Sequence, residues 1–306
     1  MTFYLIGIDH KVAPIGIREA AYWKRPHIAE QLAKYGAGRA VVLSTCNRFE
    51  IYGIAEDRAE AELKIGSLKS RFEPIFNNSY AAYGTKNMLG HLVSLAAGLK
   101  SQMIGELEIY GQLGAWALSD GFPKELAALV HDALLSSHDV RMKSGSNHTE
   151  NNIAVSLYDQ ILKAHNSDDL LNVVVAGTGK IAGLLAAYRP RDVRICFAAH
   201  KNILRAGELA GIAGGRAIFL KDLPQMLLSA DVLISATSSP HRVFGKNYFS
   251  RIAAVREKDL YIYDLAVPRD VEPVVKDING MILKNIDEVI QDARIKDRYA
   301  AEQIGA

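Results

Sequence analysis

A glycine-rich turn between an apolar strand-like run and an apolar helical stretch constrains the fold of this chain most strongly. Residues 172–176 form a run rich in β-branched side chains, Gly177 follows it, and a helical pattern continues to Tyr188. The spacing Gly177-x-Gly179-x-x-Ala182 fits the dinucleotide-binding fingerprint: a tight turn, a close approach of backbone to pyrophosphate, and a small residue where helix packs on strand. Taken alone, the motif also fits a tight structural turn in an unrelated α/β domain.

Strand and helix patterns alternate through the rest of the second half. Apolar runs at residues 193–199, 217–220, 232–236 and 260–265 are separated by polar or helical segments. This alternation favours a parallel sheet with helices on both faces. We therefore predict a Rossmann-type NADP-binding domain over residues 151–285, with cofactor contacts from Gly177, Thr178, Gly179, Lys180, Ile181, Ala182, His200 and Lys201.

The second strand of this domain ends at His200 and Lys201. An NAD-binding protein usually carries an acidic residue here, which binds the ribose 2′-hydroxyl, but no Asp or Glu is present. His200, Lys201 and Arg205 are suited to a 2′-phosphate instead, so we predict NADPH as the cofactor. The alternative is that these cations are solvated surface residues.

The first half mixes strand and helix signals. Strand patterns cover residues 3–8, 40–45 and 50–55, and helical spacing covers 59–72, 86–99, 103–118 and 125–143. These patterns predict an α+β domain over residues 1–150, with the polar stretch 144–152 at the boundary. A helical pattern over 286–303 predicts a terminal helix with too little core to form a third domain.

Composition narrows the classes of partner and compartment. The 306 residues carry 36 basic and 34 acidic side chains, which excludes strong nonspecific binding to nucleic acid by bulk charge. The two cysteines have no metal-type spacing, so neither a disulfide framework nor a metal site is expected, and the compartment is predicted to be reducing. Without an apolar run of about 18 residues, a cytoplasmic protein with no membrane partner is expected.

The two cysteines differ in their surroundings. Cys46 follows the apolar run 41–43 and has Thr45, Asn47 and Arg48 as polar neighbours. A lone cysteine is more often a small core residue, but Arg48 would favour the thiolate and so raise the reactivity of Cys46. Cys196 lies inside an apolar strand and is expected in the core.

Residues 44–52, Ser-Thr-Cys-Asn-Arg-Phe-Glu-Ile-Tyr, resemble the catalytic-loop motif of the glutamyl-tRNA reductase family. Further similar segments lie at residues 5–14, 91–92, 98–106, 109–112 and 264–270, so the resemblance spans residues 3–303. It implies that the Cys46 thiolate attacks glutamyl-tRNA to form a thioester, which NADPH reduces to glutamate-1-semialdehyde in the first step of tetrapyrrole biosynthesis. It also implies a catalytic role for His91 in proton transfer and substrate contacts from Thr45, Asn47, Arg48, Ser101, Glu106, Glu108 and Gln112.

Two of these roles have specific interpretations. Arg48 suits a guanidinium fork on the side-chain carboxylate of the glutamyl group. His91 shares a helix face with Met88, Leu92 and Leu95, so without the motif a satisfied core histidine would be the expected interpretation.

The sequence departs from the family pattern at three places. Phe49 stands where the family usually has Thr and is expected to reshape the glutamyl pocket, and Glu108 stands where the family has Gln. The sequence ends within the expected spinal helix, so we expect the family's dimerisation domain to be absent and do not expect the usual dimer. Glutamyl-tRNA and the downstream semialdehyde aminomutase are the expected partners. The alternatives are a paralogue that reduces another acyl donor and a non-catalytic binding or regulatory protein.

Overall fold

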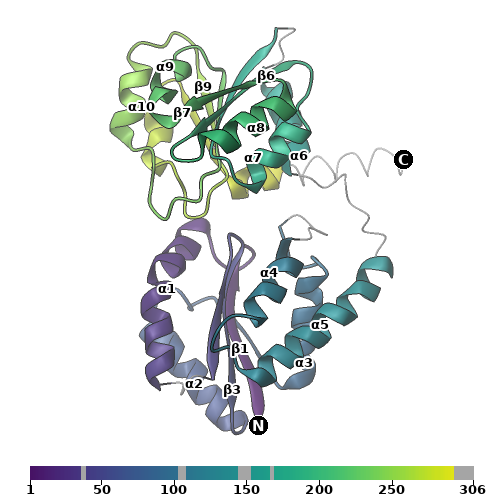
Figure 1. Cartoon of the computed structure of the whole chain (residues 1–306). Coiled ribbons are helices and arrows are strands. Elements are labelled where there is room, and N and C mark those ends of the chain that lie inside the picture. The colour runs from purple at the N-terminus through teal and green to yellow at the C-terminus, as the bar shows by residue number, and fades with distance from the viewer. Residues whose placement is uncertain (36–38, 103–107, 144–152, 166–168, 293–306) are drawn as a thin grey trace, which may run out of the picture. The chain divides into compact units, whose positions relative to one another are not determined.

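The computed structural model describes residues 1–35, 39–102, 108–143, 153–165 and 169–292 (Figure 1). The chain divides into two compact units, Met1–Asn151 and Asn152–Ala306. The boundary stretch 144–152 and the end of the predicted terminal helix lie outside the described residues, whereas residues 286–292 are helical. No helix in the described ranges is long and apolar enough to cross a membrane.

The first unit is built on an antiparallel sheet with the strand order β2-β3-β1-β4. Its strands are β1 (Thr2–Asp9), β2 (Ala40–Ser44), β3 (Arg48–Ala55) and β4 (Tyr80–Tyr83). Helices α1 (Ile15–Tyr35) and α2 (Arg58–Arg71) cover one face, and α3 (Thr85–Ala96), α4 (Glu108–Ala117) and α5 (Lys124–Lys143) cover the other (Figure 1). The α+β prediction for this half is confirmed.

Strand β3 supplies side chains to both faces because successive residues of a strand point in opposite directions. Phe49 and Ile51 join the apolar cluster under α1 and α2. Tyr52 and Ile54 join the cluster under α3, α4 and α5. All eight residues of β3 are buried, so this strand lies at the centre of the unit.

Helix α1 and strand β4 were not predicted. Pro26 lies inside α1, at a position where proline usually breaks a helix. The helix persists because Ala21, Ile28 and Leu32 are buried in the core beneath it. Tertiary packing therefore outweighs the local cost of the proline.

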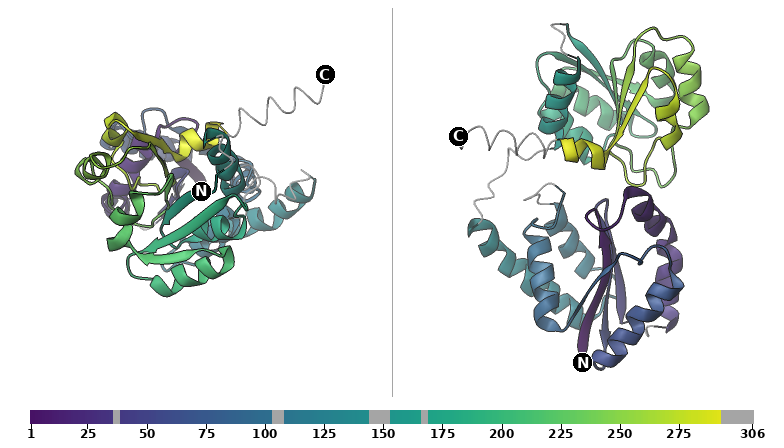
Figure 2. Two further views of the ribbon diagram at one scale, coloured as in Figure 1. Left: turned by 90° about the horizontal axis from the view of Figure 1, so that it is seen from above. Right: turned by 180° about the vertical axis from the view of Figure 1, so that it is seen from behind.

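The second unit, coloured from teal to yellow in Figure 2, is built on a parallel sheet. This sheet has six strands in the order β10-β9-β8-β5-β6-β7. The strands are β5 (Leu171–Ala176), β6 (Val193–Ala199), β7 (Arg216–Phe219), β8 (Val232–Ser235), β9 (Leu260–Asp264) and β10 (Met281–Asn285). The helices are α6 (Ile153–His165), α7 (Lys180–Ala187), α8 (Ile203–Ala213), α9 (Leu223–Leu227) and α10 (Lys246–Ala253). This strand order is that of a Rossmann fold, whose crevice for a dinucleotide lies where the order reverses, beside β5 and β8.

Cys196 lies on β6 in the apolar core of the second unit, as predicted. Burial raises the pKa of its thiol, so the neutral form is favoured. Strand β10, which was not predicted, is an edge strand that is only partly buried and so lacks a strong apolar pattern.

Candidate active site

Cys46 lies at the tip of the hairpin formed by β2 and β3. The last strand pair joins Ser44 and Phe49, and the Thr45 amide donates to the Arg48 carbonyl over 2.9 Å to close the turn. Cys46 is exposed and forms no disulfide. The hairpin therefore presents the thiol at the end of a rigid, buried strand.

Three contacts hold the hairpin tip in place. Arg18 of α1, itself only 3% exposed, donates from Nη1 to the Cys46 carbonyl oxygen over 2.6 Å. The His10 amide donates to the Asn47 carbonyl over 3.0 Å. The Asn47 amide donates to Thr45 Oγ1 over 3.2 Å. Backbone and side-chain contacts thus order the turn from both sides.

Arg48 is buried and paired with Glu50. Its Nη1 donates to Glu50 Oε1 over 3.1 Å, and its Nη2 donates to the Lys100 carbonyl over 2.5 Å. Burial alone would lower the pKa of Arg48, but the Glu50 carboxylate raises it overall. The charge of Arg48 is thus balanced by Glu50. The guanidinium that contacts the Cys46 backbone belongs to a different residue, Arg18.

Glu50 lies on β3 at the centre of a buried polar cluster, on the side of the sheet that α3 covers. Its Oε1 accepts from Arg48, from the Tyr80 hydroxyl over 2.5 Å and lies 2.9 Å from His91 Nε2, while its Oε2 accepts from the Tyr52 hydroxyl over 2.6 Å. Burial alone would raise the pKa of this fully buried carboxyl, but His91 and Arg48 hold it well below its usual range. We call Arg48, Glu50, Tyr52, Tyr80, His91 and Lys100 the Glu50 cluster.

The phenols of the cluster are held neutral. Burial and the adjacent Glu50 carboxylate raise the pKa of Tyr52 and that of Tyr80 well above the usual value. Both hydroxyls therefore act as hydrogen-bond donors to the carboxylate, which would otherwise be an uncompensated buried charge.

His91 lies on α3 with Met88, Leu92 and Leu95, as its spacing indicated, and all four are buried. Its ring contacts two aromatic rings, Tyr52 at 6.2 Å and Tyr80 at 5.9 Å between centroids. His91 is thus a buried residue with polar partners, linked to the Cys46 turn through Glu50 and Arg48.

The other predicted substrate residues are placed as follows. Ser101 is buried directly after Lys100, whose carbonyl binds Arg48. Gln112 lies on α4 with an exposed side chain. Glu106 and the side chain of Glu108 lie outside the described residues. The structure therefore brings Thr45, Cys46, Asn47, Arg48, His91 and Ser101 into one connected region.

Phe49 lies on the opposite side of β3 from this region. Its side chain is 1% exposed and contacts Phe76 at 6.3 Å between ring centroids, within the core under α1 and α2. The expectation that Phe49 reshapes the glutamyl pocket is therefore wrong. The error arose because adjacent strand residues face opposite sides of a sheet.

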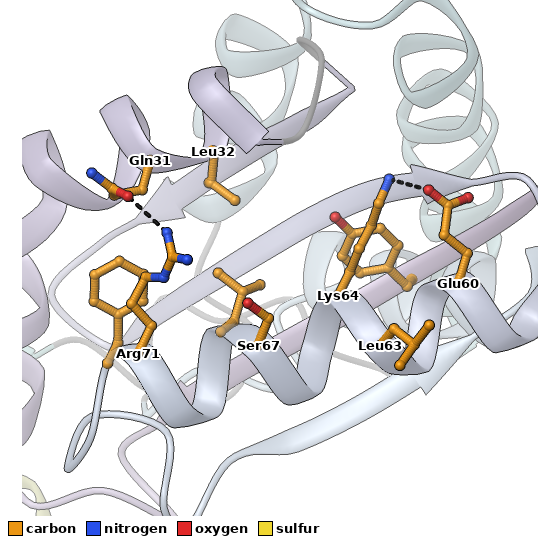
Figure 3. A pocket seen from close by; sticks show the side chains of 10 residues that line it. Gln31, Leu32, Glu60, Leu63, Lys64, Ser67 and Arg71 are labelled. Atoms are coloured by element: carbon orange, nitrogen blue, oxygen red, sulfur yellow. Dashed lines mark hydrogen bonds and ion pairs between the residues drawn. The ribbon is translucent and has the colours of Figure 1, made fainter.

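A surface pocket of about 320 Å³ lies between α1 and α2 (Figure 3). Gln31 and Arg71 meet at one end over 2.8 Å, and Lys64 and Glu60 meet at the other over 2.9 Å. The pocket lies on the face of the sheet that carries Phe49. It is not part of the Glu50 cluster, so we do not assign the chemistry to it.

In the second unit, the glycine turn has the geometry that its spacing predicted. Gly177 has a φ of 120°, and a Cβ there would lie 2.8 Å from the Ala236 carbonyl carbon, so only glycine fits. Among the described residues, a Cβ on Gly179 would meet no atom within 4 Å, which leaves open space at the start of α7. Ala182 is fully buried beneath that helix. A pyrophosphate fits such an open backbone at a helix N-terminus.

Asp270 fixes the strand end that faces the glycine turn. Its carboxylate accepts from the Ser235 hydroxyl over 2.6 Å, the Thr237 amide over 3.0 Å and the Thr237 hydroxyl over 2.6 Å. These bonds hold the segment around Ala236, whose carbonyl approaches Gly177. Asp270 therefore positions one wall of the predicted dinucleotide crevice.

Asp264 holds the loop that carries Asp270. Its two carboxyl oxygens accept from the Ala266 amide over 3.1 Å and the Val271 amide over 2.9 Å. Burial, together with the charge of Asp270, raises the pKa of Asp264 to about 7, although the amide hydrogen bonds act in the opposite direction.

His200 and Lys201 follow the end of β6 and are both exposed. Arg205, the third predicted cation, lies on α8 and pairs with Glu208 over 2.6 Å. Within the described ranges, no group of three or more His, Cys, Asp or Glu side chains is placed to hold a metal ion.

Sequence reasoning assigned no role to Arg18, Glu50, Tyr80 or Lys100. One signal could have identified Glu50: Arg48, Glu50 and Tyr52 alternate with apolar residues along β3, so they share a face of the sheet. Arg18 and Tyr80 join the site from elements remote in sequence, and no local pattern marks them. Lys100 lies in the family-like segment 98–106, but nothing in that segment indicates its contact with His91.

Two family models match the two halves of the chain. Residues 6–144 match the family model described as "Glutamyl-tRNAGlu reductase, N-terminal domain", and residues 159–291 match "Shikimate / quinate 5-dehydrogenase". Among solved structures, the chain is similar to glutamyl-tRNA reductase from Methanopyrus kandleri, with a TM-score of 0.46, 24% identity, and coverage of 99% of this chain and 76% of that one.

Curated relatives extend the similarity along the whole chain. It is 32% identical to glutamyl-tRNA reductase of Chromohalobacter salexigens, over 99% of this chain and 75% of the relative. It is 30% identical to a glutamyl-tRNA reductase of Thermus thermophilus, over 100% of this chain and 76% of the relative. The chain therefore belongs to the glutamyl-tRNA reductase family.

Proposed function

We propose that this protein reduces glutamyl-tRNA to glutamate-1-semialdehyde with NADPH, by way of a thioester on Cys46. The observation that carries the proposal is the exposed thiol at the tip of a hairpin whose backbone is tied to Arg18 and whose strand continues into the Glu50 cluster. Family membership supports the substrate class, and the glycine turn supports a dinucleotide.

In the first step the Cys46 thiolate attacks the ester carbonyl of glutamyl-tRNA. The sulfur–carbon bond forms, the bond from that carbon to the ribose oxygen breaks, and the ribose oxygen takes up one proton. A thiolate is a better leaving group than an alkoxide, so the thioester is the species better suited to reduction. The Arg18 guanidinium binds the Cys46 carbonyl and so holds the backbone that carries the thiol.

When bound, NADPH would supply a hydride, and its addition to the thioester carbon with loss of the Cys46 thiolate would give the aldehyde. Gly177, Thr178, Gly179, Lys180, Ile181 and Ala182 would hold the pyrophosphate at the start of α7. His200 and Lys201, both exposed after β6, would bind the 2′-phosphate, and this gives the preference for NADPH over NADH. Tighter binding of NADH than NADPH would contradict that preference.

Substrate contacts are assigned to residues of the hairpin turn and the neighbouring segments. The buried Asn47 carries a side-chain Oδ1 with no hydrogen-bond partner in the described structure, which suits a substrate ammonium or hydroxyl donor. Arg48 has both terminal nitrogens engaged by Glu50 and Lys100, so we propose that it meets the glutamyl carboxylate only through an additional N–H. Thr45, Ser101, Glu106, Glu108 and Gln112 remain proposed substrate contacts.

To test the proposed function, the purified chain is incubated with glutamyl-tRNA and NADPH. The semialdehyde formed, the tRNA released and the NADPH consumed are measured, and the three amounts are expected to be equal. Cys46→Ser is expected to abolish all three. Trapping without NADPH is expected to give a glutamyl adduct on Cys46 by mass spectrometry. Absence of both product and adduct would reject the proposal and favour a non-catalytic binding protein, while faster turnover of another acyl-tRNA would favour a paralogue.

We also propose that the semialdehyde product passes directly to a partner enzyme. A free amino aldehyde is reactive, so direct transfer to the semialdehyde aminomutase would protect it. Channelling is expected to show as semialdehyde that a scavenging nucleophile traps less efficiently when the aminomutase is present. Equal trapping with and without that enzyme would contradict direct transfer.

A further inference from the structure

His91 is held at both of its ring nitrogens. Nε2 lies 2.9 Å from Glu50 Oε1, and Nδ1 lies 2.9 Å from Lys100 Nζ. The histidine is 7% exposed and the carboxyl is fully buried, whereas the lysine side chain is partly exposed. Lys100 is therefore the member of this chain of contacts that reaches solvent.

The chemistry of the two neighbours determines where the ring proton sits. An ionised carboxylate only accepts hydrogen bonds, so Nε2 must donate to Glu50. An ammonium group only donates, so Nδ1 must accept from Lys100. With Lys100 in its ammonium form, a neutral imidazole with its single proton on Nε2 satisfies both contacts.

The other charged and titratable groups around His91 are consistent with this arrangement. Tyr52 from β3 and Tyr80 from β4 both donate their hydroxyls to Glu50, and Arg48 donates to the same carboxylate. These three donors keep Glu50 ionised, so it remains an acceptor for Nε2. Lys100 is also tied by its backbone, since its carbonyl accepts from Arg48.

We propose that Lys100 is a positioning residue that fixes His91 as the Nε2-protonated tautomer. The Lys100–His91 pair then shares one exchangeable proton, carried at Lys100 Nζ, the more exposed end. Burial lowers the pKa of Lys100, which makes that proton easier to transfer. The inference rests on the proposed function only for the use of that proton, which is to neutralise the leaving ribose oxygen in the first step.

The direct test is nitrogen NMR of the full chain carrying ¹⁵N-labelled histidine, with the His91 signals assigned by comparison with His91→Gln. At neutral pH the wild type is expected to show a protonated Nε2 and an unprotonated Nδ1. Lys100→Met removes the donor, so protonation at Nδ1 is expected to appear. Lys100→Arg, which also only donates, is expected to keep the wild-type pattern.

Lys86→Met is the matched control because Lys86 lies exposed on α3, the helix that carries His91. It is expected to leave the His91 signals unchanged. A wild-type pattern with the proton on Nδ1, or identical His91 signals in the wild type and Lys100→Met, would overturn the inference. The wild-type measurement decides the tautomer even where a variant fails to fold.

Steady-state kinetics separate positioning from a general loss of structure. Lys100→Met is expected to lower kcat about tenfold with a smaller change in KM and to alter the pH profile of kcat, and Lys100→Arg is expected to restore the profile. An unchanged profile in Lys100→Met would overturn the proposed use of the proton. The expected tautomer in a protein that forms no semialdehyde would reject the proposed function and leave the positioning role intact.

Discussion

Arg18 Nη1 donates to the Cys46 carbonyl oxygen over 2.6 Å and so joins the first helix of the chain to the hairpin tip that carries the thiol. Arg18 is buried, and its guanidinium has little freedom to leave this position. The contact explains how a residue 28 positions earlier in the sequence can control the orientation of Cys46.

Replacing Arg18 with Gln is expected to loosen the hairpin tip and lower kcat by about tenfold, which corresponds to about 1.4 kcal/mol of lost positioning. Semialdehyde formation and the rate of Cys46 alkylation by iodoacetamide would be measured together. Arg25→Gln is the control, since Arg25 lies on the same helix over the Tyr22 ring. Wild-type turnover and alkylation in Arg18→Gln would show that the contact does not position Cys46.

Alanine substitutions at the two glycines of the dinucleotide turn are expected to affect different properties. Gly177→Ala strains a backbone with a φ of 120° and brings a methyl group against Ala236, so unfolding free energy is expected to fall by at least about 1–3 kcal/mol. The methyl group of Gly179→Ala would contact no atom in the part of the chain that the structure describes, so stability is expected to stay near wild type while NADPH binding weakens. Thermal unfolding and NADPH fluorescence titration distinguish the two. Normal NADPH affinity in Gly179→Ala would place the pyrophosphate elsewhere.

Substitution of Phe49 is expected to affect stability rather than substrate choice. Phe49→Ala leaves a cavity beside Phe76 and is expected to cost about 3–5 kcal/mol, and Phe49→Leu is expected to cost less. The ratio of kcat/KM for glutamyl-tRNA to that for aspartyl-tRNA is expected to be the same in Phe49→Leu and wild type. A shifted ratio would mean that Phe49 influences the pocket through the sheet.

Asp264 gives the second unit a distinct pH dependence. Its pKa is about 7 in the folded protein and about 3.9 in an unfolded chain, so the folded state binds the extra proton between these values. The stabilisation is complete below about pH 4 and is lost as pH rises through about 7, by an amount on the order of 4 kcal/mol. Asp264→Asn is expected to flatten this part of the curve.

Denaturant unfolding of the wild type and Asp264→Asn between about pH 4 and 8 checks this expectation. The exposed Asp222→Asn serves as the control for the loss of one carboxyl group. Glu50 acts in the opposite direction in the first unit, because its lowered pKa stabilises the fold above the usual carboxyl range and less as pH falls. Equal slopes in the wild type and Asp264→Asn would contradict a buried neutral Asp264.

The sequence predicted the second unit more completely than the first for a physical reason. Parallel strands buried on both faces read as continuous apolar runs, so β5, β6, β8 and β9 were all expected where they occur. In the first unit, α1 was missed because its core contacts, rather than its local preferences, stabilise a helix around Pro26.

The candidate site likewise contains some residues that the sequence identifies and others that it does not. The hairpin residues Thr45 to Arg48 are consecutive, so a motif could identify them together. Tyr80 and Lys100 reach Glu50 and His91 only through the fold of the sheet and α3, and this information is not local. Strand alternation predicts that Phe49 and its neighbour Arg48 point to opposite faces of the sheet. The motif shows only that the two residues are adjacent in the sequence, and this suggested that both line the same pocket.

The alternation of β3 links correct folding of the hairpin to a working site. A slip of one residue between β2 and β3 would turn Arg48 and Glu50 into the apolar core beneath α1 and α2 and would point Phe49 and Ile51 at His91. Such a misfolded form would bury two charges without their partners and would be strongly disfavoured. The buried Arg48–Glu50 pair, which follows the hairpin tip on β3, therefore also favours the correct pairing of β2 with β3 during folding.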